Sequence, residues 1–589
     1  MSNIDTRRRP FVTAVALGAL VVIAAGCSEP APADLNDAPD AKARPGRPQM
    51  SIPDVSLVDR ARDSGLTFTQ VAGDKDKGHL PETLGSGVAI ADYDRDGDLD
   101  IYLGTGQPRV DWLAGKRPLA NGLFRNKGDG SFEEVGAAAG VDLHAWTLGT
   151  YFVDYDGDDD EDLFLSNWGA NVLYRNDGDG TFTDVSVASG IGAAQNLSAS
   201  AAFGDLDGDG DLDLWVASYC VYDMANPPAD GQSMIWRGIE VFMGPSGYEA
   251  QRDEVYVNNG DGTFTEVSRQ AGVDVDEAYF GLGIVFSDVD LDGDLDVYVA
   301  NDSVANGLWV NDSTAEGLRF RDAAFESGVA TNESAAEQAG MGVDAADYDG
   351  DGVFDLVVTN FSHDFNTLYQ NLGDLLFLDT TFEAGFSDSF AKLAWGAKWF
   401  DYDNDGALDL VIAAGHTYPA IDDLPQVGTT YHQQNMLYRN RGDGAFDEIA
   451  GQAGDGMALV MGSRGIAVAD IDEDGDLDMV VTNIDDMPTL LINEGGNQAG
   501  HWLRIRLQGG DANRAGIGAR VELESGGRRW VREMNPFGSY LSGSEAVIHV
   551  GVGDVTSVER LTVHWPSGHV DTHEAVAVDQ TLTLSEGAS

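Results

Sequence analysis

Cysteine and basic residues are scarce in this sequence of 589 residues. Its two cysteines, Cys27 and Cys220, cannot form a framework of several disulfides. Lysine and arginine total 35 against 99 aspartates and glutamates, which gives a formal net charge of −64. Because binding to phosphates needs a basic surface, we expect no nucleic-acid partner.

Familiar catalytic motifs are also missing. The chain has no GxSxG, HExxH, P-loop or CxxCH sequence, so we do not expect an enzyme. Such strong acidity often indicates disorder. However, hydrophobic residues make up 43% of the chain and aromatic residues 9%, which indicates a folded protein. The 73 glycines indicate a scaffold rich in turns.

The first 27 residues have the features of an export signal. Three arginines, Arg7 to Arg9, precede an apolar run from Phe11 to Ala25, and Cys27 follows. This pattern resembles a bacterial lipobox and predicts lipidation at Cys27. An ordinary signal peptide cleaved near Ala25 is the alternative. Residues 28–52 lack apolar periodicity and predict a flexible tether, so we expect an exported lipoprotein of the bacterial cell envelope whose only membrane contact is the lipid anchor.

One acidic loop, D-x-D-x-D-G-x-x-D or a close variant, occurs seven times. The second copy is the least regular, because it has Asp159 where the others have glycine. The candidate metal ligands are Asp92, Asp94, Asp96, Asp98 and Asp100; Asp154, Asp156, Asp158, Asp160 and Asp162; Asp205, Asp207, Asp209, Asp211 and Asp213; Asp288, Asp290, Asp292, Asp294 and Asp296; Asp347, Asp349, Asp351 and Asp355; Asp401, Asp403, Asp405 and Asp409; and Asp470, Asp472, Asp474, Asp476 and Asp478.

The spacing of the acids predicts the chemistry of these loops. Carboxylates at positions 1, 3 and 5 converge in a tight turn, position 7 offers its backbone carbonyl, and the acid at position 9 closes the shell. Hard oxygen ligands in a flexible loop suit Ca²⁺, whereas so many unpaired carboxylates would repel one another. The sequence therefore predicts up to seven calcium ions, one for each loop.

The segments around the loops repeat as well. A β-strand is predicted on each side of the loop, and a hairpin with a Gly-Asp-Gly turn follows, as in Leu123 to Phe132. Four-stranded repeats that cannot bury their own faces favour a β-propeller. We therefore expect an all-β chain with a seven-bladed propeller over residues 53–497. Because the last repeat lacks a fourth strand, a strand near Leu57 is expected to complete it.

The acidity ends near residue 498. Leu503, Ile505 and Leu507 alternate with polar residues, and so do Val521 with Leu523 and Leu561 with Val563. This period of two predicts a small β-sandwich-like domain over residues 498–589.

The loops resemble the FG-GAP/VCBS repeats of integrin α-subunit propellers, which implies Ca²⁺ binding. Leu80-Pro-Glu-Thr-Leu-Gly85 and Trp565-Pro-Ser-Gly568 resemble the cartilage acidic protein family, which has a C-terminal ASPIC/UnbV domain. The resemblance covers roughly residues 53 to 589. It implies an adhesion or ligand-binding module.

Three long insertions, 104–120, 218–253 and 415–434, are predicted on the face opposite the calcium loops, because strands alternate in direction within a blade. They carry aromatic residues that suit protein or glycan contacts: Trp112, Tyr222, Trp236, Phe242, Tyr248, Tyr418 and Tyr431. The alternative for each residue is packing within its own loop. We expect a binding module for a protein or glycan of the envelope; a lectin-like protein, or a propeller lyase or oxidoreductase, is the alternative.

Overall fold

The computed structural model describes residues 54–227, 234–242, 244–245, 247–273, 279–314, 317–510 and 513–588. The predicted signal peptide, the lipidation site Cys27 and the tether 28–52 lie outside these ranges. Residues 50–589 form one compact unit. Among the described residues, no helix is long and apolar enough to cross a membrane.

Strand pairing in the described part of the chain gives seven antiparallel units of four strands, called units 1 to 7 here. Units 2 and 3 are joined into one eight-stranded sheet, because Leu197 pairs with Trp168. Each unit is given in pairing order: β2–β3–β4–β5 (Val88–Ala91, Asp100–Leu103, Gly122–Asn126, Phe132–Glu134); β6–β7–β8–β9 (Thr147–Val153, Asp162–Gly169, Val172–Asn176, Phe182–Asp184); β10–β11–β14–β15 (Asn196–Gly204, Asp213–Ser218, Glu254–Asn258, Phe264–Glu266); β16–β17–β18–β19 (Gly281–Ser287, Asp296–Asn301, Gly307–Asn311, Phe320–Asp322); β20–β21–β22–β23 (Val343–Ala346, Asp355–Val358, Thr367–Asn371, Phe377–Asp379); β24–β25–β27–β28 (Ala394–Phe400, Asp409–Ala414, Met436–Asn440, Phe446–Glu448); and β30–β31–β32–β1 (Ser463–Ala469, Asp478–Asn483, Thr489–Glu494, Ser56–Asp59).

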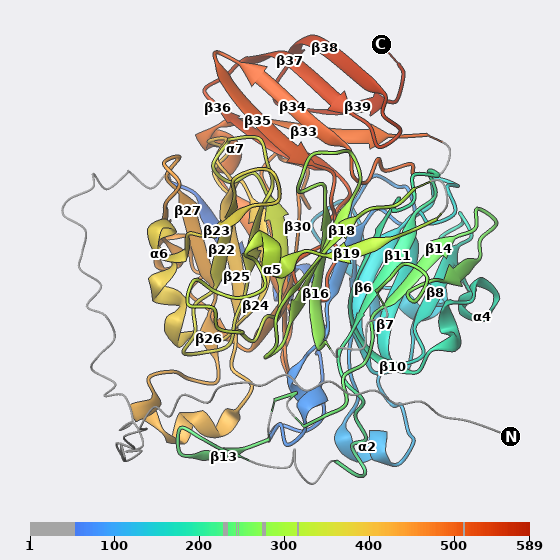
Figure 1. Cartoon of the computed structure of the whole chain (residues 1–589), viewed down its shortest axis with the longest axis vertical. Coiled ribbons are helices and arrows are strands. Elements are labelled where there is room, and N and C mark those ends of the chain that lie inside the picture. The colour runs from blue at the N-terminus through green and yellow to red at the C-terminus, as the bar shows by residue number, and fades with distance from the viewer. Residues whose placement is uncertain are drawn as a thin grey trace, which may run out of the picture. The chain divides into compact units, whose positions relative to one another are not determined.

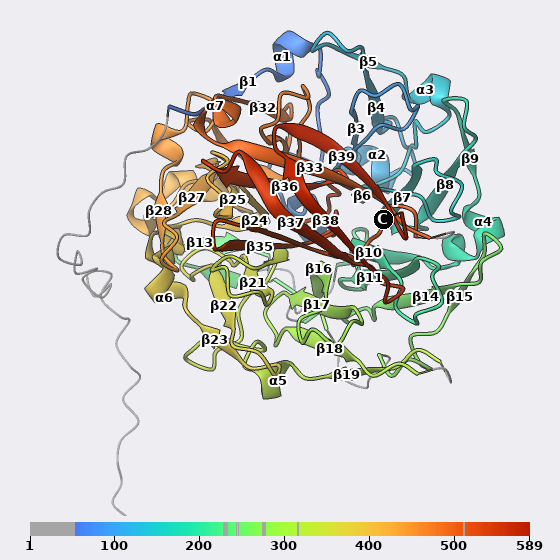
Figure 2. The same cartoon turned by 90° about the horizontal axis from the view of Figure 1, so that it is seen from above.

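The units follow one another around a ring in chain order (Figure 2). Their first and second strands are almost entirely buried, because each unit packs between its neighbours. The fourth strands of units 1 to 6 have three residues, and the first of these is a buried phenylalanine in every case. Such short outer strands leave little exposed edge for pairing with another chain. The all-β class and the propeller-like arrangement are confirmed.

The N-terminal strand completes the last unit, as the sequence predicted. Strand β1 pairs with β32 in an antiparallel register that places Leu57 opposite Asn493. Beside it, Arg60 donates a hydrogen bond of 2.6 Å to Glu494. The first and last parts of the ring are therefore joined through backbone pairing.

Short helices and further strands connect the units. The α-helices are α1 (Ala61–Ser64), α2 (Arg109–Leu113), α3 (Gly136–Ala139), α4 (Ser186–Ser189), α5 (Ala324–Ser327), α6 (Thr381–Ala384) and α7 (Gly496–Ala499). The 3₁₀-helices are η1 (Leu80–Thr83), η2 (Ile191–Ala193), η4 (Phe386–Ala391), η5 (Pro419–Asp423), η6 (Pro425–Val427) and η7 (Ala450–Gln452). Two strand pairs, β12 (Met234–Trp236) with β13 (Ile239–Val241) and β26 (Gln433–Gln434) with β29 (Val460–Met461), lie within the connections.

The C-terminal region folds as two packed sheets, which agrees with the predicted β-sandwich-like domain. One sheet contains β36 (Ile548–Gly553), β33 (His501–Gln508) and β39 (Gln580–Ser585). The other contains β35 (Arg528–Glu533), β34 (Arg520–Ser525), β37 (Ser557–His564) and β38 (Val570–Ala577). The alternating apolar residues of these strands are buried between the sheets. Figure 1 shows this domain at one end of the ring.

Between β35 and β36, residues 535–544 enter the axis of the ring. We call them the axial segment. One hydrogen bond or more joins this segment to the first strand of every unit, with partners that include Val88, Thr150, Ser200, Phe286, Val343, Lys398 and Val468. Tyr540 and Leu541, at its centre, are fully buried. The axis is therefore filled by the chain itself at this level.

Candidate metal centres and insertion loops

Each acidic loop is folded around the carboxylate at its first position. In the third loop, Asp205 accepts backbone N–H groups from Gly208 at 2.8 Å, Asp209 at 3.1 Å and Gly210 at 3.0 Å. The loop backbone thus wraps around one acid and turns the acids at positions 3 and 5 toward the same centre.

Two positions in each loop adopt the left-handed backbone conformation. One is the glycine at position 6, and Gly210 has φ +99°. In the irregular second loop, Asp159 takes this conformation with φ +71°. Position 4 is left-handed as well, even where it is not glycine, as at Leu291 with φ +61°. Such strain in non-glycine residues persists only where the surroundings hold it in place.

The carboxylate groups of the loops converge closely enough to hold a metal ion. Oxygen atoms of Asp205, Asp207 and Asp213 lie within 4.8 Å of one another, and equivalent clusters occur in other loops, including the first, second, fourth and fifth. Several of these oxygens are buried without a hydrogen-bond partner, among them the Oδ1 atoms of Asp92 and Asp94. Unpartnered buried carboxylate oxygens fit a hard divalent cation, which prefers such ligands.

The acid at position 9 accepts backbone hydrogen bonds, which is a structural role in addition to its predicted role as a metal ligand. In the third loop, both oxygens of Asp213 accept backbone N–H groups, one from Leu206 at 3.0 Å and one from Asn258 at 2.9 Å. The same pair of hydrogen bonds recurs at the six equivalent acids, Asp100, Asp162, Asp296, Asp355, Asp409 and Asp478. Position 9 therefore ties the acidic loop to the third strand of its unit.

In units 2 to 7, an asparagine at the end of the third strand links the unit to the preceding one. Asn258 donates from Nδ2 to the carbonyl of Leu212 in its own unit at 3.2 Å and to that of Tyr155 in the unit before at 2.9 Å. Asn176, Asn311, Asn371, Asn440 and Asn493 make the equivalent inter-unit bond. Sequence reasoning missed this role, although the asparagine recurs in every repeat.

The acids at position 7 lie on the hairpin side of the loop. A Cβ atom added to Gly128, the first glycine of the hairpin turn, would be 2.7 Å from Oδ2 of Asp98. Asp160 and Asp211 lie in the same way against Gly178 and Gly260. This agrees with a loop in which the carbonyl of position 7, and not its side chain, would face a metal ion.

Protein cations pair with acids of the second, sixth and seventh loops. Arg439 pairs with Asp403 at 2.7 Å and with Asp405 at 2.9 Å, using oxygens other than the unpartnered Oδ1 of Asp403. Arg504 of the C-terminal domain pairs with Asp470 at 3.2 Å. In the second loop, Arg95 pairs with Asp160 at 3.0 Å. The seven loops are therefore not equivalent, and a cation already offsets part of the negative charge in the second, sixth and seventh.

The buried acids at position 9 give the metal-free protein a pH dependence. Burial raises the pKa of Asp100 and Asp296 to about 8 and that of Asp162 to about 9. In the unfolded chain these pKa values return toward 3.8. Between pH 3.8 and the folded pKa values, the folded state therefore binds more protons than the unfolded state, and it loses stability as the pH rises. In EDTA, melting should therefore occur at a higher temperature at about pH 5.5 than at about pH 8.5. With saturating Ca²⁺ this difference should shrink, and a metal-free melting temperature that rises with pH would contradict the assignment.

The described parts of the three long insertions lie on the face opposite the C-terminal domain. Figure 1 shows α2 and β13 at the end of the body away from β33 to β39. The acidic loops lie on the other face: a Cβ on Gly475 of the seventh loop would be 1.9 Å from the ring of Trp502 in the C-terminal domain. The acidic loops and the insertion loops thus occupy opposite faces, as strand direction predicted.

The predicted aromatic residues come together in the insertion loops, but most are not exposed. Tyr222, Phe242, Tyr248, Tyr418 and Tyr431 each have an exposed fraction of 7% or 8%. Their rings pack against one another. The ring centroids of Tyr222 and Tyr248 are 5.3 Å apart, and those of Phe242 and Tyr418 are 5.2 Å apart. These five side chains mainly support the loops.

Trp112 and Trp236 are partly buried and pack on the same cluster. Trp112 contacts Trp168, with ring centroids 4.8 Å apart, and Trp236 contacts His416 at 5.4 Å. The exposed apolar side chains around them are Val110 at 70%, Leu113 at 49%, Val221 at 47% and Ile235 at 69%. Sequence reasoning did not select these aliphatic residues.

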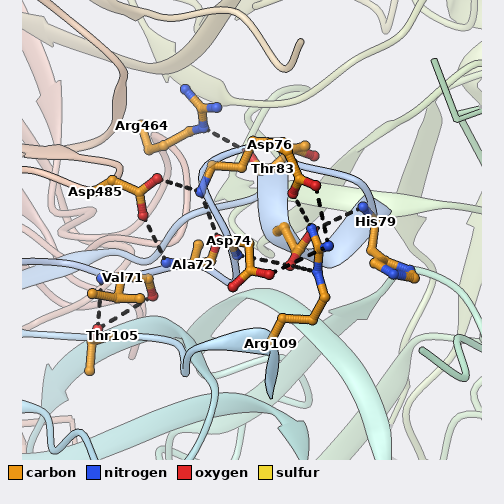
Figure 3. Close-up of polar contacts among 12 residues, drawn as sticks. Val71, Ala72, Asp74, Asp76, His79, Thr83, Thr105, Arg109, Arg464 and Asp485 are labelled. Atoms are coloured by element: carbon orange, nitrogen blue, oxygen red, sulfur yellow. Dashed lines mark hydrogen bonds and ion pairs between the residues drawn. The ribbon is translucent and has the colours of Figure 1, made fainter. Parts of the chain in front are cut away.

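A buried polar network fixes the first insertion to the ring (Figure 3). Arg109 of α2 donates from Nε to Glu82 of η1 at 2.6 Å, and its guanidinium also contacts Asp76. Lys77 pairs with Asp485 of unit 7 at 2.6 Å. Residues 77–82 therefore connect the first insertion to unit 7.

Arg464 of β30 extends this network. Its guanidinium donates from Nε to the carbonyl of Thr83 at 2.8 Å, as Figure 3 shows, and lies 4.2 Å from the centre of the Trp395 ring. It also donates to the carbonyl of Gly415, where the third insertion begins. The base of the insertion face is thus held by buried charged side chains.

Comparison with known proteins gives matches over most of the chain. The family described as FG-GAP-like repeat matches residues 154–216, 239–299, 288–358, 347–412 and 422–512. The family described as ASPIC and UnbV matches residues 509–589. Cartilage acidic protein 1 of Mus musculus is 26% identical over 558 residues, covering 86% of this chain and 74% of that protein. The Homo sapiens protein of the same name is 26% identical over 534 residues, covering 86% and 72%.

Solved structures show weaker similarity. One is an Agrocybe aegerita lectin described as recognising non-reducing terminal N-acetylglucosamine; it is 17% identical, with 61% of this chain and 77% of that chain covered and a TM-score of 0.36. Trypanosoma rangeli sialidase is 10% identical, with 64% and 57% covered and a TM-score of 0.34. Neither similarity supports a statement about ligand or reaction. The family matches, with the repeated acidic loops, show that the chain belongs to the FG-GAP-like repeat family and has a C-terminal ASPIC and UnbV domain.

Proposed function

We propose that this protein is an exported, calcium-stabilised interaction module that binds a protein or glycan of the cell envelope on its insertion-loop face. Lipidation at Cys27 would anchor it to a membrane. Ca²⁺ is the proposed ion because the loops offer carboxylate and carbonyl oxygens in a flexible turn. The proposal is one of binding and assigns no catalytic residue.

The observation that carries the proposal is the arrangement of the insertions. Loops from units 1, 3 and 6 meet on one face, over a buried aromatic cluster that fixes their shape. Exposed apolar side chains such as Val110 and Ile235 lie in these loops. Exposed apolar residues on a rigid support are typical of interaction surfaces.

Replacing an exposed apolar residue on this face should weaken ligand capture. We expect Val110→Asp and Ile235→Asp each to reduce binding by about tenfold, because a charge would be buried at the contact. The measurement is binding of the purified chain to a glycan array and to separated envelope proteins. Val187→Asp is the matched control, since Val187 is 89% exposed on α4 at the rim. Equal capture by all three variants would assign binding to another face.

A further inference from the structure

A cavity of about 110 Å³ lies between the acidic-loop face of units 5 to 7 and the C-terminal domain. It is lined by residues of β24 and β33, by β35 and by the start of the axial segment. It is therefore separate from the insertion-loop face, and the proposed function does not use it.

Several buried polar atoms in the cavity wall have no hydrogen-bond partner. They include Nε1 of Trp399 and the Nε atoms of Arg504 and Arg532. Trp399 is 6% exposed and Arg504 is 4% exposed. Indole and guanidinium nitrogens can only donate, so these three N–H groups need an acceptor, and no described residue provides one within hydrogen-bond distance.

The charges in the wall are unequally paired. Among the described residues, Arg532 has no carboxylate within ion-pair distance; its terminal nitrogens donate to the carbonyls of Val531 at 2.9 Å and Gly406 at 3.4 Å. In contrast, Asp344 pairs with Lys398 at 3.0 Å and Glu545 with Arg504 at 2.8 Å. A guanidinium with a buried Nε and no carboxylate within ion-pair distance is costly, so an anion within that distance would stabilise it.

Three further acids line the cavity. Glu533 accepts an N–H group from Asp288 at 3.0 Å, and Oδ1 of Asp401 is buried without a hydrogen-bond partner. Asp347 and Asp401 also line the cavity, but they are the first residues of the fifth and sixth acidic loops. Their carboxylates accept N–H groups from Gly350 at 2.8 Å and Gly406 at 2.9 Å. A metal ion in either loop would offset their charge further and leave Arg532 as the uncompensated group.

We propose that this cavity binds a small oxyanion, of the sulfate or carboxylate type, through Arg532, Trp399 and Arg504. A guanidinium matches the geometry of oxyanions, and hydrogen bonds to a charged acceptor are stronger than neutral ones. The three donors come from β24, β35 and β33. The bound anion therefore joins the ring to both sheets of the C-terminal domain.

The test is melting of the purified full-length chain at saturating Ca²⁺ and fixed ionic strength, with chloride replaced by sulfate or by formate. We expect a saturable rise in melting temperature, and the more effective anion identifies the class. Arg532→Met should abolish the rise. Arg529→Met is the matched control, because Arg529 lies on the same strand, is more exposed and pairs with Glu522 at 3.0 Å. A rise of equal size in wild type and Arg532→Met, or no rise with either anion, would overturn the proposal.

A second variant tests the proposal independently of whether Arg532→Met folds. Trp399→Phe removes the indole N–H and keeps an aromatic ring against Tyr348. In the wild type, the ring centroids of Trp399 and Tyr348 are 5.8 Å apart. It should weaken anion binding by about tenfold, the effect of one hydrogen bond to a charged group. Crystals soaked in selenate should show an anomalous signal in the cavity. A cavity that holds only water and gives no such signal would also contradict the proposal.

Discussion

Chelation of divalent cations should lower the melting temperature of this protein by about 10 °C. An ion that binds only the folded state adds ~2.7 kcal/mol per site at a concentration of about 100 times its Kd. Four occupied loops would add about 11 kcal/mol on this basis, which is comparable to the net stability of a whole domain. For a body of this size, unfolding entropy converts that energy to about 10 °C. Calorimetry in Ca²⁺ and in EDTA measures the shift.

One loop can be removed at a time. Asp209→Ala takes a ligand from the third loop and should reduce the Ca²⁺-dependent shift by one site. Asp261→Ala is the matched control: it changes the net charge equally, but Asp261 lies exposed in the hairpin turn of the same unit, where it accepts an N–H from Thr263. Equal melting in Ca²⁺ and EDTA would mean that the loops do not bind Ca²⁺ in the folded state.

Gly87→Ala should destabilise the protein severely by displacing the axial segment. A Cβ atom at residue 87 would lie 1.6 Å from the carbonyl oxygen of Leu541 and 2.4 Å from its carbonyl carbon. Both are backbone atoms, so the clash cannot be relieved by rotating a side chain. We expect a loss of more than about 4 kcal/mol, at the upper end of single substitutions. Denaturant unfolding measures the loss, and limited proteolysis should show new cleavage within residues 535–544.

Gly451→Ala is the control for that substitution. Gly451 lies in η7, and a Cβ atom added there would point into open space, with no other atom within 4 Å. This variant should keep wild-type stability and the wild-type cleavage pattern. If Gly87→Ala behaves in the same way, the axial segment does not fill the ring in solution.

The acidic loops and the strand order could be predicted because each repeat contains its own signals. The aspartates, the glycine at position 6 and the hairpin turns are local features that recur along the chain. The strand near Leu57 could be predicted to join the last repeat because its sequence resembles the fourth strand of the others. In the C-terminal domain, the period of two identified buried residues such as Leu503 and Val521.

The axial segment could not be predicted, because its sequence has no periodicity and its partners are distant in the chain. Leu541, for example, bonds to Ser200 and Thr150. The sequence alone also could not show which side chains of the insertions are exposed. Tyr222 and Tyr248 have the residue type of a binding surface, but only the fold shows that they pack on each other and leave Val110 and Ile235 to the solvent.

The pairing of β1 with β32 has a consequence for how the chain folds during synthesis or export. Arg60 and Glu494, which meet beside this pair, are 434 positions apart in the sequence. A chain that emerges from its N-terminus cannot close the ring until residue 494 has appeared, and the axial segment follows later still. The units must first assemble as an open arc with unpaired strand edges at both ends. Pairing of strands so far apart in the sequence is slow. The chain is therefore most susceptible to aggregation and proteolysis while it is an open arc.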